Sequence, residues 1–444
     1  MLGRQYITNL INQMTLREKA AEMTQLWGEN PDGTLMGILR GFHSNEHLAA
    51  NAGSLLGFNG AERVLKAQRI HIEESAHKIP FLFMTDVIHG YKTIFPSVLG
   101  LGATWNPSLV EETAAAAAGE AAVSGVHVTF SPMADLVKDA RWGRVIESTG
   151  EDPYLNGLFA AAFTKGYQGE GVDKPLKIAS CVKHFAGYGA VEGGRDYDSV
   201  WLSDYQLYNE YLPPFTAALN AGCELLMPAF NTLNGIPCTA NRPLLHDLLR
   251  QGLNFEGVIV SDCTAICELL PHGICETPDG AAAMSLDAGV DIEMVSSFYY
   301  ENLEKLVKDG RISMEQVDEA VERILTLKDK LGLFENPYKD ASVEKERGLH
   351  LCPAHRALAR KAAAEAAVLL KNEKNVLPIG KTDRIALIGP YGDSRKLLDI
   401  WGLVNGNEED CVTLSEALSD YAPVTAPGCH LWNFRNLDED HPSD

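Results

Sequence analysis

The sequence of 444 residues lacks the short patterns that mark several large classes of binding site. No G-x-G-x-x-G segment opens a helix after the first apolar run, and no glycine loop of the phosphate-binding type occurs. There is no H-E-x-x-H, no C-x-x-C pair and no other spacing of a metal site. We therefore expect no metal and no cofactor.

Positive charge and long apolar runs are also scarce. Lys and Arg number 38 against 60 Asp and Glu, which gives a formal net charge of −22. Such an acidic surface disfavours nucleic acid and suits a neutral or cationic small substrate. No stretch approaches ~18 consecutive apolar residues, so no segment is expected to span a membrane.

The cysteines are nine in number, an odd count, and they are scattered. This pattern is typical of free thiols in a reducing compartment rather than of a disulfide framework. The first ten residues, MLGRQYITNL, lack the apolar stretch of a signal peptide. Both features predict a cytoplasmic protein.

Short apolar runs alternate with helical patterns along most of the chain. Each run is bounded by polar or glycine residues, as is typical of a buried parallel strand. The expected strands are Ser54–Phe58, Phe81–Asp86, His127–Met133, Ile178–His184, Glu224–Phe230, Val258–Asp262 and Val290–Met294, and the helices between them include Ala61–Ala76, Pro107–Ser124, Asp204–Ala221 and Pro278–Ala288. Repeated βα units predict an α/β fold, either a doubly wound sheet or a closed (β/α)₈ barrel.

Polar residues end nearly every expected strand. They include Thr85-Asp86, Lys183-His184, Ser261-Asp262 and Glu293. A barrel collects its chemistry from the C-terminal ends of many strands, whereas a doubly wound sheet concentrates it at one switch point. The pattern therefore favours a (β/α)₈ TIM-type barrel, which we place at residues 1–335.

The barrel pattern fades after an expected helix at Met314–Leu331. Residues 336–380 predict a linker and a connecting helix, the latter at Ala354–Asn372. Residues 381–444 predict the start of an α/β sandwich domain. That segment is short for a domain of this class. We therefore expect a missing C-terminal domain or a homo-oligomer to complete it.

Two aspartates directly follow buried strands and are the leading carboxylate candidates. Asp262 follows the apolar run of GVIVSDC, and Asp86 stands in the same position in FLFMTDVIHG. An aspartate in this position can act on a ligand at the mouth of a barrel, or it can cap a helix or pair with a buried cation. The residues alone leave both interpretations open.

Cationic side chains lie at comparable positions. Lys183 and His184 close IASCVKHF, where unpaired burial is costly, so we expect them to bind a hydroxyl-rich ligand. Arg141 and Arg144 lie on the charged loop DARWGRVIESTGEDP. We expect Glu147 to hold these arginines in place.

Seven segments stand in collinear order along nearly the whole chain. They are MTLREKAAEMTQL (14–26), FMTDVIHGYKTIFPSVLGLGATWNP (83–107), FSPMADLVKDARWGRVIESTGEDPYL (130–155), CVKHFAGYGAVEGGRDYD (181–198), MPAFNTLNGIPCTAN (227–241), GVIVSDCTAI (257–266) and AAAEAAVLLKNEKNVLPI (362–379). Together they resemble the family 3 glycoside hydrolases, the β-glucosidase and β-xylosidase group. No single segment decides this, but the ordered set is highly specific.

The resemblance implies a barrel joined to an α/β sandwich, and a double-displacement mechanism with retention of configuration. It implies that Asp262 is the nucleophile. It also implies that the sugar is bound by Asp86, Lys183, His184 and Arg144, with Arg141 at a neighbouring family position and with Met227 and Glu293 at strand ends that line the site.

Four departures from the family pattern bear on activity. Ala140 replaces the proline of D-P-R-W-G-R, and Cys263 replaces the tryptophan that follows the nucleophile in many members. The loop Ala186–Gly194 lacks the histidine dyad of the N-acetylglucosaminidase branch, which argues against that branch. In β-glucosidase-like members the general acid/base is a glutamate of the second domain, which is expected beyond the end of this chain.

The expected activity is that of a retaining β-glycosidase that removes terminal non-reducing β-D-glucosyl residues from a β-glycoside substrate. Three alternatives stay open. They are a β-xylosidase of the same family, a non-catalytic sugar-binding fragment, and an aldolase that forms a Schiff base on Lys183.

Overall fold

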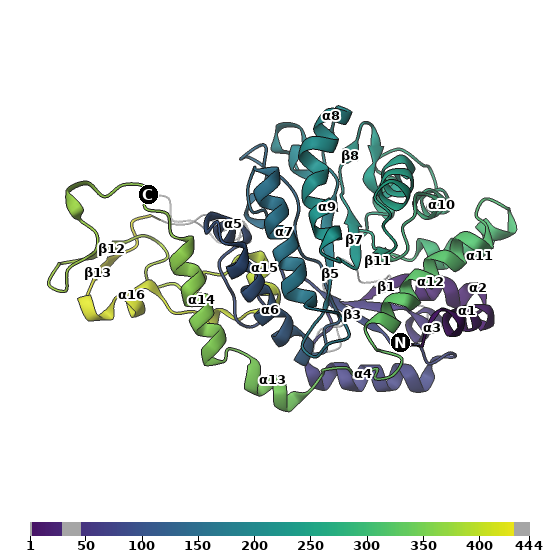
Figure 1. The fold of residues 1–444 in the computed structure, drawn as a ribbon, viewed down its shortest axis with the longest axis horizontal. Coiled ribbons are helices and arrows are strands. Elements are labelled where there is room, and N and C mark those ends of the chain that lie inside the picture. The colour runs from purple at the N-terminus through teal and green to yellow at the C-terminus, as the bar shows by residue number, and fades with distance from the viewer. Residues whose placement is uncertain (1, 29–45, 430–444) are drawn as a thin grey trace, which may run out of the picture. The chain divides into compact units, whose positions relative to one another are not determined.

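A computed structural model describes residues 2–28 and 46–429 (Figure 1). The chain divides into two compact units, Met1–Ala367 and Val368–Asp444. The last part of the expected third segment, residues 430–444, lies outside the described residues. The segment boundaries at 335 and 380 stay predictions.

Eight parallel strands form the centre of the first unit. They are β1 (Thr24–Trp27), β2 (Ser54–Leu56), β3 (Leu82–Thr85), β4 (Val128–Thr129), β5 (Ala179–Phe185), β7 (Leu225–Pro228), β10 (Val258–Ile259) and β11 (Glu293–Met294). Each pairs with its neighbour in chain order, and β11 pairs with β1. A parallel bridge between Val260 and Ile292 joins β10 to β11, so the sheet closes on itself. The expected TIM-type barrel is confirmed.

The first strand, β1, has no counterpart among the strands expected from the sequence. Its four residues, TQLW, follow helix α2 (Leu16–Glu22) with only Met23 between them. No glycine or proline separates the two elements, so the period of the helix masks the strand. Six of the remaining seven strands fall within the expected runs and are shorter, and β5 ends one residue past its expected end at His184.

Helices follow the strands and cover the outside of the barrel (Figure 1). Besides α2, the longer elements are α1 (Arg4–Gln13), α3 (Glu46–Asn51), α4 (Ala61–Glu74), α5 (Val98–Ala103), α6 (Pro107–Val123), α7 (Pro153–Gln168), α9 (Leu212–Asn220), the π-helix η7 (Pro243–Gly252), α10 (Pro278–Ala288), α11 (Phe298–Lys308) and α12 (Met314–Lys330). The expected helix over residues 204–221 is made of α8 (Asp204–Gln206), a π-helical turn η5 (Leu207–Tyr211) and α9.

Local sequence signals explain where these helices begin, end and pack. The Asn106 side chain accepts from the backbone N–H of Leu109 and caps α6 ahead of Pro107. Gly289 ends α10 in the left-handed conformation at φ +108°. A Cβ on Gly166 of α7 would lie 2.5 Å from the carbonyl oxygen of Glu111. Glycine there, facing the alanines of α6, allows the two helices to pack closely.

The loops after β5 and β7 pair with each other at the C-terminal end of the barrel. In them β6 (Ser199–Val200) runs parallel to β8 (Thr232–Leu233), which forms a hairpin with β9 (Ile236–Pro237). This small sheet fixes the two loops beside the strand ends where the polar candidates lie.

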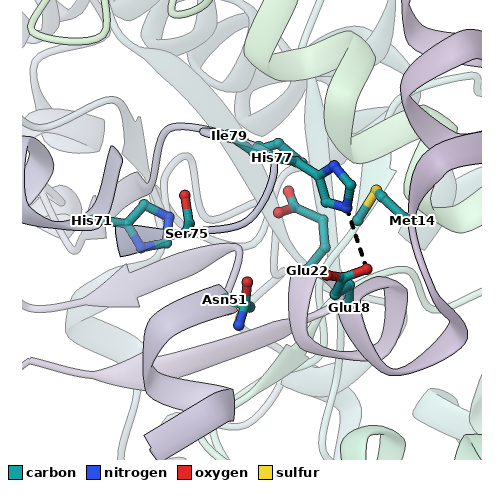
Figure 2. Close-up of a pocket in the computed structure, with 8 residues that line it drawn as sticks. All are labelled: Met14, Glu18, Glu22, Asn51, His71, Ser75, His77 and Ile79. Carbon is teal, nitrogen blue, oxygen red and sulfur yellow. Dashed lines mark hydrogen bonds and ion pairs between the residues drawn. The ribbon is translucent and has the colours of Figure 1, made fainter. Parts of the chain in front are cut away.

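The opposite, N-terminal end of the barrel carries buried charges that are paired. Figure 2 shows Glu18 and His77 pointing toward one another, with Glu18 Oε2 3.2 Å from His77 Nε2. Glu22, which is 2% exposed, forms an ion pair with Lys328 of α12, which is fully buried. Burial raises the pKa of Glu22 and lowers that of Lys328. Glu18 and Glu22 precede β1, His77 precedes β3 and Lys328 lies in α12, so these residues belong to the N-terminal end of the barrel.

The chain after the barrel first packs on it and then forms the second unit. Helices α13 (Val343–Leu349) and α14 (Pro353–Ala366) pack against α6, and α14 ends six residues before its expected end. The second unit contains the parallel pair β12 (Ala386–Ile388) and β13 (Val424–Ala426), with α15 (Ile400–Asn405) and α16 (Leu414–Ala417). Among the described residues, no helix is long and apolar enough to cross a bilayer.

Candidate active site

Five of the eight predicted site residues meet at the C-terminal end of the barrel. Asp86 follows β3, Lys183 and His184 lie in the last part of β5, Asp262 follows β10, and Arg144 lies on the loop after β4. Lys183 Nζ donates to Asp86 Oδ1 at 2.8 Å. Arg144 Nη2 lies 3.1 Å from His184 Nε2, which in turn lies 3.4 Å from Asp262 Oδ2. The ends of three strands and the loop after a fourth thus contribute to one polar cluster.

The two carboxylate oxygens of Asp262 differ in their environment. Oδ1 accepts from the backbone N–H of Cys263 at 2.7 Å. Oδ2 is shielded from solvent and accepts no hydrogen bond from any residue that the structure describes. Burial raises the pKa of Asp262 to about 6, while Arg144 and Lys183 act to lower it. Asp262 is therefore ionised at neutral pH with one oxygen free to bond, as a nucleophile requires.

His184 is fixed between a carboxylate and a guanidinium group. Its Nδ1 lies 2.8 Å from Asp135 Oδ2, which also accepts from the His184 backbone N–H at 3.0 Å. Since a guanidinium can only donate, Nε2 accepts from Arg144 and the proton is on Nδ1. Burial, Arg144 and Lys183 all hold the pKa of His184 well below its usual range. The ring is thus neutral, which explains why Nε2 donates nothing to Asp262.

Arg144 is held by the carboxylate that the sequence predicts for it. Its Nε and Nη2 donate to the two oxygens of Glu147, each at 2.8 Å. Burial alone would lower the pKa of Arg144, but Glu147 raises it above the usual value. This two-point contact fixes the plane of the guanidinium group as it faces His184.

Asp135 and Tyr188 belong to this cluster although the sequence does not single them out. Asp135 is fully buried, and burial raises its pKa to about 7. The Tyr188 ring packs edge-on against His184, with ring centroids 5.3 Å apart, and Arg144 lies over its face at 5.4 Å. An aspartate in the otherwise apolar run FSPMADL is the one signal that points to Asp135.

Arg141 lies apart from the cluster. Its side chain is 74% exposed, and its Nη2 lies 2.6 Å from Asp139 Oδ2. The backbone N–H of Arg141 donates to the same carboxylate at 2.9 Å. Because Asp139 is only two residues away, this local turn directs Arg141 into solvent and not toward Asp262.

Glu293 and Met227 are buried in the barrel wall. Both oxygens of Glu293 are engaged, since they accept from the backbone N–H groups of Phe298 and Tyr299 at 2.8 and 2.7 Å and from the Ser296 hydroxyl. Glu293 therefore caps the start of α11. Met227 lies inside β7 and is 2% exposed. Their contact with a sugar stays a prediction.

Several other buried polar atoms near the same strand ends have no partner among the described residues. They include Trp27 Nε1 at the end of β1 and Asn231 Oδ1 after β7. Each unsatisfied buried group costs roughly 1–3 kcal/mol. A ligand rich in hydroxyl groups would satisfy both donors and acceptors of this kind. Within the described ranges, no three His, Cys, Asp or Glu side chains are arranged to hold a metal ion.

Comparison with known proteins gives consistent results. Residues 15–327 match the N-terminal domain of glycosyl hydrolase family 3. A periplasmic β-glucosidase of Salmonella typhimurium is 35% identical over 440 residues, which cover 97% of this chain and 57% of that protein. A β-xylosidase of Formosa agariphila is 34% identical over 399 residues, covering 86% and 50%.

A solved structure agrees over 97% of the chain. The β-glucosidase of Listeria innocua in complex with isofagomine superposes with a TM-score of 0.92 at 42% identity, covering 97% of this chain and 61% of that one. The chain therefore spans 57% and 61% of the lengths of the Salmonella and Listeria proteins.

The prediction of a cytoplasmic location is wrong, because the Salmonella relative is named a periplasmic enzyme. The free thiols misled that prediction. All nine cysteines are free, but Cys181, Cys223 and Cys238 are fully or almost fully buried, and burial raises the pKa of each thiol. Buried thiols of this kind are unreactive and need no reducing compartment.

The family match over residues 15–327 and the relatives that align along nearly the whole chain show that this chain belongs to glycosyl hydrolase family 3.

Proposed function

We propose that this chain carries the catalytic barrel of a retaining β-glucosidase, with Asp262 as the nucleophile. The observation that carries the proposal is the ionised Asp262 carboxylate with one unbonded oxygen, set among Asp86, Lys183, His184 and Arg144. The names of relatives support the sugar. Structures of the Listeria enzyme are described in complex with glucose, gluconolactone and laminaribiose.

In the proposed binding mode, Asp86 and Lys183 hydrogen-bond to the hydroxyl groups of the terminal sugar. A carboxylate accepts from two hydroxyl groups, and an ammonium group donates to others. Arg144, held by Glu147, adds a directed donor beside the nucleophile, and neutral His184 helps to hold it there by accepting from Arg144 Nη2. Contacts that tighten as the sugar ring flattens lower the barrier to reaction.

In the proposed mechanism, Asp262 Oδ2 attacks the anomeric carbon, the glycosidic C–O bond breaks, and a glycosyl-enzyme ester forms. Water then attacks the same carbon from the other face and releases Asp262, so two inversions give net retention. Arg144 and Lys183 are the cations that keep Asp262 ionised before the attack. An additional domain, beyond the residues of this chain, or a second copy of the chain stays part of the proposal.

A β-xylosidase is the second candidate, because relatives at 34% and 37% identity carry that name. The aldolase alternative has less support. Lys183 Nζ pairs with Asp86 Oδ1 at 2.8 Å, and its side chain is 4% exposed, so a Schiff base on Lys183 would have to break this buried ion pair.

The test is hydrolysis of 4-nitrophenyl β-D-glucoside and β-D-xyloside by the 444-residue chain, followed by proton NMR. We expect faster release from the glucoside, with β-glucose appearing before its α anomer. Faster release from the xyloside would favour the xylosidase. Release of α-glucose first would contradict retention, and glucose binding by calorimetry without any release would favour the non-catalytic alternative.

A further inference from the structure

The loop after β5 ends in a tight turn just before β6, and Tyr197 stands at the tip of this turn. The backbone N–H of Asp198 donates to the carbonyl of Arg195 at 3.2 Å, and Arg195 Nε donates to Asp198 Oδ2 at 2.6 Å. Asp196 Oδ1 accepts from the indole N–H of the buried Trp142 at 2.9 Å. The chain is therefore fixed on both sides of Tyr197.

The backbone of Tyr197 lies in the left-handed region, at φ +67°. A positive φ at the third position of a turn is usually met by glycine or asparagine, because the Cβ of other residues crowds the backbone. Residues held in such conformations gather at functional sites. A tyrosine here is unfavourable for the turn itself, which points to a role for its ring.

Tyr197 is the outermost of a row of rings that begins beside the nucleophile. The His184 ring, whose Nε2 lies 3.4 Å from Asp262 Oδ2, meets the Tyr188 ring edge-on with centroids 5.3 Å apart. The Tyr188 ring packs edge-on against Phe230 at 6.1 Å, and Phe230 stacks on Tyr197 at 4.4 Å. The first three rings are buried, whereas Tyr197 is 42% exposed. The row thus leads from the nucleophile to the protein surface, which it reaches at Tyr197.

The polar residues of the site show which part of a substrate meets this ring. Lys183 and Asp86, the proposed sugar ligands, have side chains only 4% and 18% exposed, so the terminal sugar occupies the buried end of the site. The leaving group must then extend from the anomeric carbon toward solvent. Burial, followed by the negative charges of Glu268 and Asp262, raises the pKa of the Tyr197 hydroxyl, which agrees with a place beside the outer part of the site.

We propose that Tyr197 binds the leaving group of the β-glucoside with the open part of its ring and so favours cyclic leaving groups, pyranose or aryl, over small ones. The proposal rests on the β-glucosidase function proposed above. Phe230 holds the tyrosine ring from one side, and ring faces bind flat or cyclic groups by stacking. The contact acts in the first step alone, because the leaving group has departed before water attacks the glycosyl-enzyme.

The test compares Tyr197→Asn with the parent chain on two β-glucosyl donors whose leaving groups need no proton. 2,4-Dinitrophenyl β-glucoside carries an aromatic leaving group, whereas β-glucosyl fluoride carries a single atom. We expect kcat/KM for the dinitrophenyl substrate to fall about three- to tenfold, while the value for the fluoride stays that of the parent. Asparagine suits the left-handed turn, so this variant removes the ring and keeps the backbone.

Two further variants serve as controls. Tyr197→Phe keeps the ring and should match the parent on both donors. Tyr6 of α1 is a matched tyrosine away from the site, since it is 43% exposed and packs edge-on against Phe334 with centroids 5.6 Å apart. Tyr6→Asn should leave kcat/KM for both donors unchanged.

Laminaribiose binding gives a second measure that does not depend on turnover. With Asp262→Asn in place, calorimetry should show that Tyr197→Asn weakens laminaribiose binding about three- to tenfold and leaves glucose binding unchanged. Equal losses on the two donors, no loss on the dinitrophenyl substrate, or laminaribiose affinity independent of Tyr197 would overturn this assignment while leaving the β-glucosidase in place. A parent chain that turns over neither donor would contradict the proposed function instead, and laminaribiose binding would still decide the role of Tyr197.

Discussion

The two ends of the barrel differ in whether their buried charged groups are fully paired. At the N-terminal end Lys328 pairs with Glu22, and Lys19 Nζ lies 2.5 Å from Asp318 Oδ1. At the C-terminal end, Asp262 and Glu268 each keep an oxygen that no described residue bonds. The N-terminal end thus serves stability, and the C-terminal end keeps polar atoms available for a substrate at some cost in stability.

The largest effect is expected at the C-terminal end, from Asp262→Asn. Loss of the nucleophile should lower kcat/KM for 4-nitrophenyl β-glucoside by about 10³-fold or more. The folded-state pKa of Asp262 is raised, so its contribution to stability is present below its unfolded value and is lost as the pH rises through about 6. The variant should therefore gain up to roughly 3 kcal/mol at pH 8. Urea unfolding at pH 8 and pH 4 measures this gain, which should shrink at pH 4.

Lys328→Met should have the converse effect at the N-terminal end. Removing the cation leaves Glu22 buried without its partner, which should cost about 3–5 kcal/mol in the free energy of unfolding. The kcat/KM of the folded fraction should not change. The double variant Glu22→Leu with Lys328→Met is the control and should recover most of the stability. A loss of kcat/KM without a loss of stability would break the comparison between the two ends.

The pH profile should show the ionisation of Asp262 directly. Because Asp262 must be ionised to attack and its pKa lies at about 6, kcat/KM should fall about tenfold per pH unit below that value. Arg144→Lys should shift this acid limb to higher pH, because lysine loses the two-point contact with Glu147 and places its charge less well. An acid limb near pH 4 in the parent chain would mean that burial does not raise the pKa of Asp262.

The smallest effect is expected from Arg141→Ala. The side chain is exposed and pairs with Asp139 at the surface, so the free energy of unfolding should change by about 0.5 kcal/mol or less. Its kcat/KM should match that of the parent, in contrast to Arg144→Lys. A tenfold loss for Arg141→Ala would show that Arg141 turns into the site when substrate binds.

The sequence predicts those site residues that stand at the ends of apolar strand-forming runs. Asp86, Lys183, His184 and Asp262 each follow or end an apolar run, and closing the barrel brings the strand ends together. The fold class follows from the same runs. The closure itself rests on β1, whose four residues lack flanking turn signals and so give no separate pattern.

The remaining site assignments depend on contacts that no local pattern contains. Arg141 and Arg144 are equivalent by spacing, but Asp139 and Glu147 direct them to different places. Glu293 ends a strand as Asp262 does, yet the backbone of α11 takes both of its oxygens.

The most direct test of the central claim is the intact mass of the 444-residue chain after incubation with 2,4-dinitrophenyl 2-deoxy-2-fluoro-β-D-glucoside. This leaving group needs no proton donor, so the result depends on the nucleophile alone. We predict one fluoroglucosyl group per chain, with peptide mapping that places it on Asp262. An adduct on another residue, or no adduct at a site that still binds glucose, would contradict the assignment of Asp262 as the nucleophile of a retaining glycosidase.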